Sequence, residues 1–229
     1  MPQCPQLTEG MDLYLDTADD AAWQDLMPTG MFRGITTNPV LAHRAGLDYP
    51  TIDWLAKAKH ARDLGAQELH AQVFGPVEGY VAWAEALFEA GSVAGLRTVV
   101  KIPMTPEGIR AVPAIKALGG PILMTAVYHP KQVFVAKALN AEFVAPYFGR
   151  MDESGLPAMD MLEQMSIIAD GQPRVLVASL RNADQMIALA TRGLDCFTLS
   201  PDIARSLLSD PMTEAAAATF EAAAAGEVL

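Results

Sequence analysis

The sequence is poor in the side chains that build disulfide frameworks and metal sites. Its 229 residues include two cysteines, Cys4 and Cys196, and four histidines. Two cysteines cannot form a disulfide framework, and no CxxC or HxxxH pair has the spacing of metal ligands. We therefore expect reduced thiols and no metal site, which disfavours a zinc-dependent enzyme.

Positive charge and long apolar runs are also scarce. Sixteen Lys and Arg stand against 27 Asp and Glu, and the net charge of -11 repels phosphate backbones and anionic lipid headgroups. No apolar run approaches the roughly 20 residues of a spanning helix, and the first ten residues lack the regions of a signal peptide. These absences predict no nucleic-acid partner, no membrane partner and a cytoplasmic location.

Apolar residues, in contrast, are plentiful. Hydrophobic residues make up 51% of the chain and charged residues 19%, which suffices for a sizeable core. Residues 1–10 hold two prolines and no periodic apolar pattern, so they are predicted to be a mobile extension. Because no linker or composition break follows, residues 11–229 are predicted to form one domain.

Short apolar runs alternate with longer stretches of helical spacing, several of which end in Gly. The runs cover residues 12–17, 34–38, 68–74, 98–103, 121–127, 143–148, 174–180 and 196–200. Eight strand–helix units predict the α/β class and a single-domain (β/α)8 TIM barrel, ending in a C-terminal helix. A doubly wound open sheet also alternates, but it often carries a glycine-rich phosphate loop where this chain has DLYLDTADD.

Polar residues gather at the ends of the predicted strands, where a barrel of this kind binds its ligand. They are Asp16, Thr36, Asn38, Gln72, Lys101, Thr125, Tyr147, Arg150, Ser179 and Arg181. Lys101 interrupts the apolar run TVVKIP, and a strand period of two turns its side chain into the barrel. Burial lowers the pKa of a lysine, and the free amine is the nucleophile of Schiff-base chemistry. Burial alone does not distinguish a catalytic lysine from a lysine buried in a structural ion pair with Asp16, so both alternatives stay open.

Seven motifs occur in the order LYLDT, GITTNP, AQVFG, VVKIPMTPEG, MTAVYHPKQ, AEFVAPYFGR and VLVASLR. Together they resemble the small transaldolase and fructose-6-phosphate aldolase family, from about residue 12 to at least residue 220. The resemblance implies a class I aldolase or transaldolase that needs no cofactor. Its Schiff-base lysine on the fourth strand is Lys101.

The resemblance also implies roles for the other strand-end residues. Asp16 relays protons or holds a substrate hydroxyl, and Thr36 and Asn38 bind sugar hydroxyls. For Asn38 the alternative is a helix cap ahead of Pro39. Gln72, Thr125 and Tyr147 match the trio that holds a catalytic water in the aldolase branch, although such residues also satisfy backbone groups or pack as core aromatics.

Two arginines are candidates for a phosphate anchor. Arg150, Arg181 and Ser179 follow the sixth and seventh strands, and paired guanidiniums bind phosphate through forked hydrogen bonds. The alternative is that both arginines pair with surface carboxylates. The expected substrates are therefore small-molecule ketoses and aldoses that carry a phosphate.

The implied reaction retains a three-carbon enamine after C–C cleavage. We favour an aldolase, like fructose-6-phosphate aldolase, because transaldolases of the family resemble a pattern with Glu in place of Gln72 and Phe in place of Tyr147. The alternative is a transaldolase of pentose phosphate metabolism, and a second is a nonenzymatic sugar-phosphate-binding barrel. His129 and Pro130 depart from the family pattern, and their effect on donor choice is open. Resemblance alone implies a homo-oligomer, a pentamer or decamer.

Overall fold

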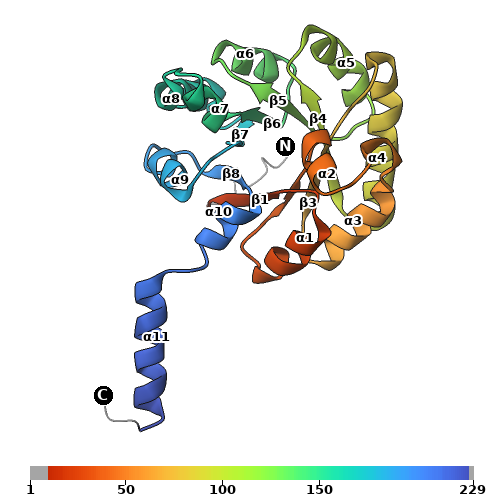
Figure 1. The fold of residues 1–229 in the computed structure, drawn as a ribbon. Helices are drawn as coiled ribbons and strands as arrows, with labels where there is room; N and C mark the ends of the chain where they lie inside the picture. The colour runs from red at the N-terminus through yellow and green to blue at the C-terminus, as the bar shows by residue number, and fades with distance from the viewer. Residues whose placement is uncertain (1–9, 227–229) are drawn as a thin grey trace, which may run out of the picture.

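The computed structural model describes residues 10–226, so the extension predicted for residues 1–10 lies, except for Gly10, outside the described residues. Strands and helices alternate along the chain (Figure 1). The strands are parallel and lie in the order β7-β6-β5-β4-β3-β2-β1-β8. They are β1 (Asp12–Asp16), β2 (Gly34–Thr36), β3 (Glu68–Gln72), β4 (Arg97–Pro103), β5 (Ile122–Val127), β6 (Phe143–Pro146), β7 (Arg174–Val175) and β8 (Cys196–Leu199).

The sheet closes on itself beyond β7. Val177 donates its backbone N–H to the Cys196 carbonyl at 2.9 Å and accepts from Thr198 N–H at 2.9 Å, which joins the segment after β7 to β8. The predicted (β/α)8 barrel is thereby confirmed. Its helices are α1 (Asp20–Leu26), α2 (Pro39–Arg44), α3 (Trp54–Asp63), α4 (Tyr80–Ala94), α5 (Pro106–Lys116), α6 (Lys131–Ala138), α7 (Phe148–Glu153), α8 (Ala158–Ala169), α9 (Ala183–Ala190), α10 (Pro201–Ser206) and α11 (Pro211–Ala224).

Most of the predicted strands extend beyond the observed ones by one or two residues, and the seventh differs most. β7 has two residues instead of the predicted seven, and the chain beyond it pairs only through isolated bridges at Val177 and Ala178. Ser179 then adopts a left-handed φ of 64°, which ends the extended conformation. β2 ends at Thr36 because Asn38 already caps α2.

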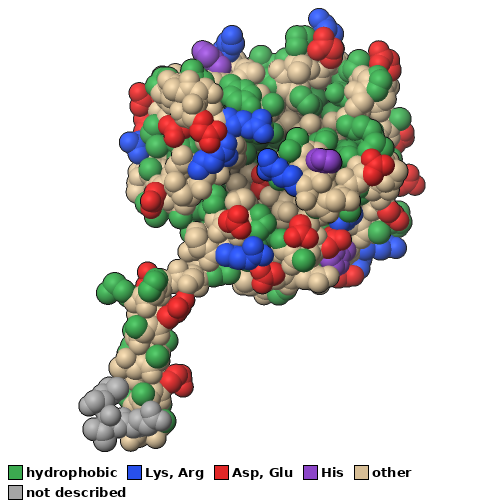
Figure 2. All heavy atoms as spheres, in the orientation of Figure 1, with side chains coloured by type: hydrophobic (Ala, Val, Ile, Leu, Met, Phe, Trp, Pro, Cys, Tyr) green, Lys and Arg blue, Asp and Glu red, His purple; other side chains and the backbone are tan. Residues whose placement is uncertain are grey.

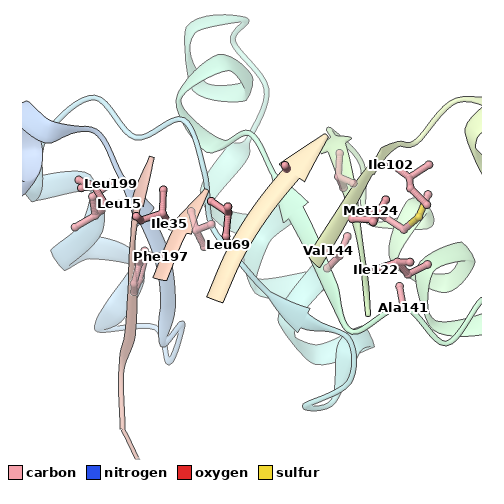
Figure 3. Close-up of a cluster of buried hydrophobic side chains, with 14 of the residues drawn as sticks. Leu15, Ile35, Leu69, Ile102, Ile122, Met124, Ala141, Val144, Phe197 and Leu199 are labelled. Carbon is pink, nitrogen blue, oxygen red and sulfur yellow. The ribbon is translucent and has the colours of Figure 1, made fainter. Parts of the chain in front are cut away.

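Alternate strand side chains fill two separate apolar layers. One layer lies between the strands and the surrounding helices, as Figure 3 shows for Leu15, Ile102 and Val144. The other fills the barrel interior and is made of Tyr14, Val99, Leu123, Phe143, Ala145, Leu176 and Cys196. The barrel is therefore packed with side chains in its middle, so a ligand site is confined to one of its ends.

A buried ionic network closes the N-terminal end of the strands. Glu68 is 1% exposed and accepts hydrogen bonds from Tyr14 OH at 2.9 Å, Arg33 Nε at 3.2 Å and Arg97 Nη1 at 3.0 Å. The arginines donate to Oε1, whereas Oε2, which accepts from Tyr14, also lies 2.8 Å from His70 Nε2. Burial alone would raise the pKa of Glu68, but His70 and the two arginines outweigh it and hold that pKa below its usual value.

The C-terminal helix α11 projects away from the barrel (Figure 1). None of its residues is buried, and Met212 and Phe220 are 82% and 69% exposed. An apolar side chain at this exposure gains nothing from the hydrophobic effect. Within residues 10–226, no helix combines the length and the hydropathy needed to cross a bilayer.

Candidate active site

A single cavity at the C-terminal end of the strands, here called the mouth, brings the ten predicted site residues together. It has a volume of about 600 Å³ and is lined by Asp16, Thr36, Asn38, Gln72, Lys101, Thr125, Tyr147, Arg150, Ser179 and Arg181, with other residues between them. Figure 2 shows a hollow in this face with Lys and Arg side chains at its rim. The residues come from seven strands and from the segments that directly follow them, Arg150 from the first turns of α7, so barrel closure brings them together.

A larger cavity of about 930 Å³ opens at the opposite end of the barrel. Its lining includes Arg33, Arg97 and Arg174, and each of these forms ion pairs with carboxylates. Active sites in this fold lie at the C-terminal end of the strands. The smaller cavity at the mouth is therefore the candidate site.

Lys101 lies at the base of the mouth and is 4% exposed. Its neighbours Val100 and Ile102 pack toward the helices, as a strand period of two predicts. Burial lowers the pKa of Lys101, and only the charge of Asp16 opposes this effect. Among the described residues, Lys101 donates no hydrogen bond to Asp16, so the two interact through charge alone. Lys101 therefore holds more free amine at neutral pH than an exposed lysine does.

Asp16 is held by a chain of hydroxyl groups. Thr36 Oγ1 donates to Asp16 Oδ1 at 2.6 Å and lies 2.6 Å from Thr198 Oγ1 of β8. Thr36 therefore orients the carboxylate as well as lining the cavity. Thr198 and Ser200 also line the mouth. Both are polar residues at the end of β8, so the placement that predicted the other site residues could also have predicted these two.

The predicted water-binding trio comes from strands near β4. Gln72 lies on β3 and Thr125 on β5, the two neighbours of β4, and Tyr147 directly follows β6. Gln72 is the register partner of Lys101 on β3, and its backbone exchanges two hydrogen bonds with the Tyr49 hydroxyl, at 2.7 and 2.9 Å. Thr125 Oγ1 and Tyr147 OH are 3.0 Å apart. Burial raises the pKa of Tyr147, so its phenol is protonated at neutral pH and can donate a proton.

Asn38 has a structural task in addition to its place in the mouth. Its Oδ1 accepts from the N–H groups of Val40 and Leu41 at 2.9 and 3.0 Å, so the helix-cap alternative is correct for the carbonyl oxygen. The amide nitrogen is left for a ligand. Arg44, at the end of α2, also lines the cavity. The sequence did not predict it, because only polar residues at the ends of strands were considered.

The two predicted anchor arginines differ in their partners. The Arg150 guanidinium lies 5.1 Å from the centre of the Tyr147 ring and donates to Tyr128 OH at 3.5 Å. The Arg181 guanidinium donates two hydrogen bonds to the Glu153 carboxylate, from Nε to Oε1 at 2.6 Å and from Nη2 to Oε2 at 2.9 Å. The pairing with a surface carboxylate, which was the alternative, is present at Arg181, and its partner Glu153 lies exposed on α7.

The departure at His129 and Pro130 lies outside the cavity wall. His129 is exposed, and its Nδ1 accepts from the Lys131 N–H at 3.1 Å. Pro130 is buried at the start of α6. Among residues 10–226, no three His, Cys, Asp or Glu side chains are grouped so that they could hold a metal ion.

A family profile described as transaldolase/fructose-6-phosphate aldolase matches residues 13–228. Among curated proteins, one named "Probable transaldolase" from Phenylobacterium zucineum is 32% identical over 89% of this chain and 92% of its own length. Its namesake from Desulfatibacillum aliphaticivorans is 31% identical over 92% and 96%. A mandelate oxidase structure aligns with a TM-score of 0.58 at 10% identity, covering 88% of this chain and 72% of that one; this shows a shared fold alone.

Proposed function

Because the chain belongs to the transaldolase/fructose-6-phosphate aldolase family, we propose that it is a Schiff-base transaldolase with Lys101 as its nucleophile. Membership makes it an enzyme of the aldolase or transaldolase class. The observation that carries the proposal is the burial of Lys101 at the mouth with no charge but that of Asp16 to compensate it. Such a lysine has the depressed pKa that imine formation requires.

The reaction begins at C2 of a ketose. The Lys101 amine attacks the carbonyl, water leaves, and the protonated imine withdraws electrons while the C3–C4 bond breaks. Asp16 lies on β1, three positions from β4 in the strand order, and its charge acts on Lys101. We assign it the proton from the C4 hydroxyl. An aldehyde departs, and a three-carbon enamine stays on Lys101.

Transfer to a second aldehyde completes the transaldolase reaction. The enamine carbon attacks the acceptor carbonyl, the new alkoxide takes the proton from Asp16, and water hydrolyses the imine. The names of the curated relatives support this transfer better than the release that the sequence favours. Phosphorylated ketoses and aldoses of pentose phosphate metabolism are the proposed substrates.

Aldolase activity is the second candidate, and the hydrogen bond between Thr125 and Tyr147 favours it. A protonated phenol that holds a water beside Gln72 could protonate the enamine and release a free ketone. Exchanging Gln72 for Glu together with Tyr147 for Phe should shift the partition from release to transfer. An unchanged partition in the presence of an acceptor aldehyde would refute the role of this trio.

Borohydride trapping tests the nucleophile directly. The protein is incubated with fructose 6-phosphate and borohydride, and intact and peptide masses are measured. We expect a reduced three-carbon adduct on the peptide that contains Lys101 and none in the Lys101→Met variant. If no ketose gives an adduct, the chain is a nonenzymatic sugar-phosphate-binding barrel. An adduct that passes to an erythrose 4-phosphate acceptor establishes transfer.

The exposed apolar side chains of α11, among them Met212 and Phe220, support a homo-oligomer, and the cytoplasmic location stays a prediction. A pentamer or decamer is the proposed assembly, with residues 11–229 as one catalytic domain. Light scattering of the full chain and of a chain ending before α11 measures the contribution of this helix. If truncation leaves the assembly unchanged, α11 has no part in it.

A further inference from the structure

One side of strand β3 loses its backbone partner at Gln72. The N–H and carbonyl groups of alternate strand residues face the same neighbouring strand, so those of His70 and Gln72 both face β2. The Thr37 N–H donates to the His70 carbonyl at 2.9 Å. The same register would place Pro39 at the Gln72 carbonyl, but proline has no N–H, and Pro39 begins α2. The backbone of Gln72 therefore needs partners from outside the sheet.

The hydroxyl group of Tyr49 supplies both partners. It donates to the Gln72 carbonyl at 2.7 Å and accepts from the Gln72 N–H at 2.9 Å. Tyr49 is 6% exposed, and burial raises the pKa of its phenol, so the hydroxyl keeps the proton that it donates. A single side chain thus replaces the missing continuation of β2.

Three aromatic side chains fix the ring of Tyr49. Trp54 and Phe74 meet it edge to face, with ring centres 5.4 and 5.3 Å away, and Trp83 stacks on it at 6.4 Å. Tyr49 belongs to a small apolar cluster against which these rings pack. Close packing on several sides limits the rotation of the ring, so the hydroxyl has a fixed position relative to β3.

Gln72 depends on its backbone for its position in the mouth. It lines the cavity and is the register partner of Lys101. The hydrogen bonds that Gln72 forms with Tyr49 involve its backbone, which leaves the side-chain amide for a ligand or a water. A shift of the backbone at Gln72 therefore moves the amide relative to Lys101.

We propose that Tyr49 is a positioning residue for proton transfer at the mouth. Its hydroxyl holds the Gln72 backbone, so that the amide is fixed beside Lys101 and orients the water that exchanges a proton with the enamine. Tyr49 does not itself line the cavity, and it acts through Gln72. The inference rests on the proposed function, because the enamine forms only on a lysine that makes an imine.

Hydrogen exchange of dihydroxyacetone isolates this proton transfer. The Lys101 amine and the ketone form a protonated imine and release water. A C–H bond next to the imine carbon then breaks, its electron pair forms the C=C bond of the enamine, and the proton passes to the oriented water. In D2O the reverse step places a deuteron on the same carbon. The exchange therefore needs neither C–C cleavage nor an acceptor aldehyde.

The test compares Tyr49→Phe with the unchanged protein, since this variant keeps the ring and removes the hydroxyl. Deuterium incorporation into dihydroxyacetone is followed by NMR, and the amount of imine is measured by borohydride trapping. We expect the exchange rate per trapped imine to fall by about three- to tenfold. An unchanged rate per imine overturns the proposal. An unchanged protein that forms the imine but exchanges no hydrogen overturns it equally.

Gln72→Ala separates positioning from general support. Tyr49 bonds to the backbone of residue 72, and this backbone is still present in Gln72→Ala. The loss of stability caused by Tyr49→Phe, measured by urea unfolding, should therefore be the same in both backgrounds. The loss of exchange should vanish in the Gln72→Ala background, where no amide is left to position. If it persists there, Tyr49 does not act through Gln72.

Tyr14→Phe is the matched control. Tyr14 is also a buried tyrosine, but its hydroxyl donates to Glu68 at 2.9 Å, at the opposite end of the strands. This variant loses a buried hydrogen bond without disturbing the backbone of Gln72, so its exchange rate per imine should stay unchanged. An equal fall in Tyr14→Phe would assign the effect to lost stability and overturn the role of Tyr49.

Binding separates this inference from the proposed function. Glucitol 6-phosphate, a phosphorylated polyol without a carbonyl group, is titrated calorimetrically into all of these proteins. If no protein traps an imine, the proposed function fails, while weaker binding to Tyr49→Phe that disappears in the Gln72→Ala background still supports the positioning role. Equal binding in that case overturns it. If imines form and exchange per imine is unchanged in Tyr49→Phe, the inference fails and the proposed function stands.

Discussion

Replacing Lys101 by Met should abolish imine formation and stabilise the barrel at the same time. Lys101 is 4% exposed, and only the charge of Asp16 offsets its desolvation. Methionine has a similar length and no charge. Replacing buried ionic groups by well-packed apolar residues of similar volume often stabilises proteins, by up to about 4 kcal/mol, and the weak compensation of Lys101 places Lys101→Met in this class. In a domain of this size, each kcal/mol raises Tm by roughly 2–4 °C.

The gain should depend on pH with a defined sign. Burial lowers the pKa of Lys101 in the folded protein below the value of about 10.4 that an exposed lysine has. Between these two pKa values the unfolded chain binds more protons, so the unchanged protein becomes more stable as the pH rises. The advantage of Lys101→Met is therefore largest at or below neutral pH and shrinks toward about pH 10.

Urea and thermal unfolding at about pH 7 and about pH 9.5 measure both effects. Lys59→Met is the control, because Lys59 is exposed on α3 and its replacement should change stability little at either pH. The reasoning is refuted if Lys101→Met is less stable than the unchanged protein. It is refuted equally if the difference in stability is the same at both pH values, since Lys101 would then carry no depressed pKa.

Two further substitutions test the two ends of the barrel. Glu68→Gln should destabilise the fold by about 3–5 kcal/mol in urea unfolding at neutral pH. Because the pKa of Glu68 is lowered, its stabilisation is present above about pH 4.3 and is lost as the pH falls, so the variant should show a flatter acid profile. Gly149→Ala should cost about 1–3 kcal/mol by displacing Ser179 and Arg181, and calorimetry should show weaker binding of glycerol 3-phosphate; unaltered binding would contradict this.

Much of the fold and the mouth could be predicted because both follow from short-range patterns. A strand period of two directs Lys101 inward between Val100 and Ile102, whatever the tertiary details. The parallel strands then carry Asp16, Gln72 and their counterparts to the same end of the barrel. The seven-residue prediction for the seventh strand was too long because only the backbone at Ser179 reveals where the extended chain ends.

The contacts that tune the site could not be predicted, since they join residues distant in the sequence. Glu153 and Arg181 are 28 residues apart, and the sequence around either residue does not indicate that the two form an ion pair. Asn38 is compatible with a cap and with a ligand, and its two amide atoms divide these tasks. Arg44 lies in the mouth only because α2 follows β2 directly into it.

Glu68 and Lys101 illustrate why burial of a charge does not by itself identify a functional site. Glu68 begins strand β3, Lys101 interrupts the apolar strand β4, and both are almost fully buried, at 1% and 4% exposure. Glu68 accepts hydrogen bonds from several donors, and these donors hold its pKa below the usual value, so the carboxylate stays charged. Lys101 has no such partners among residues 10–226, and burial lowers its pKa, which favours the neutral amine. The fold thus compensates one buried charge fully and leaves the other poorly compensated, and the poorly compensated one is the group that can react.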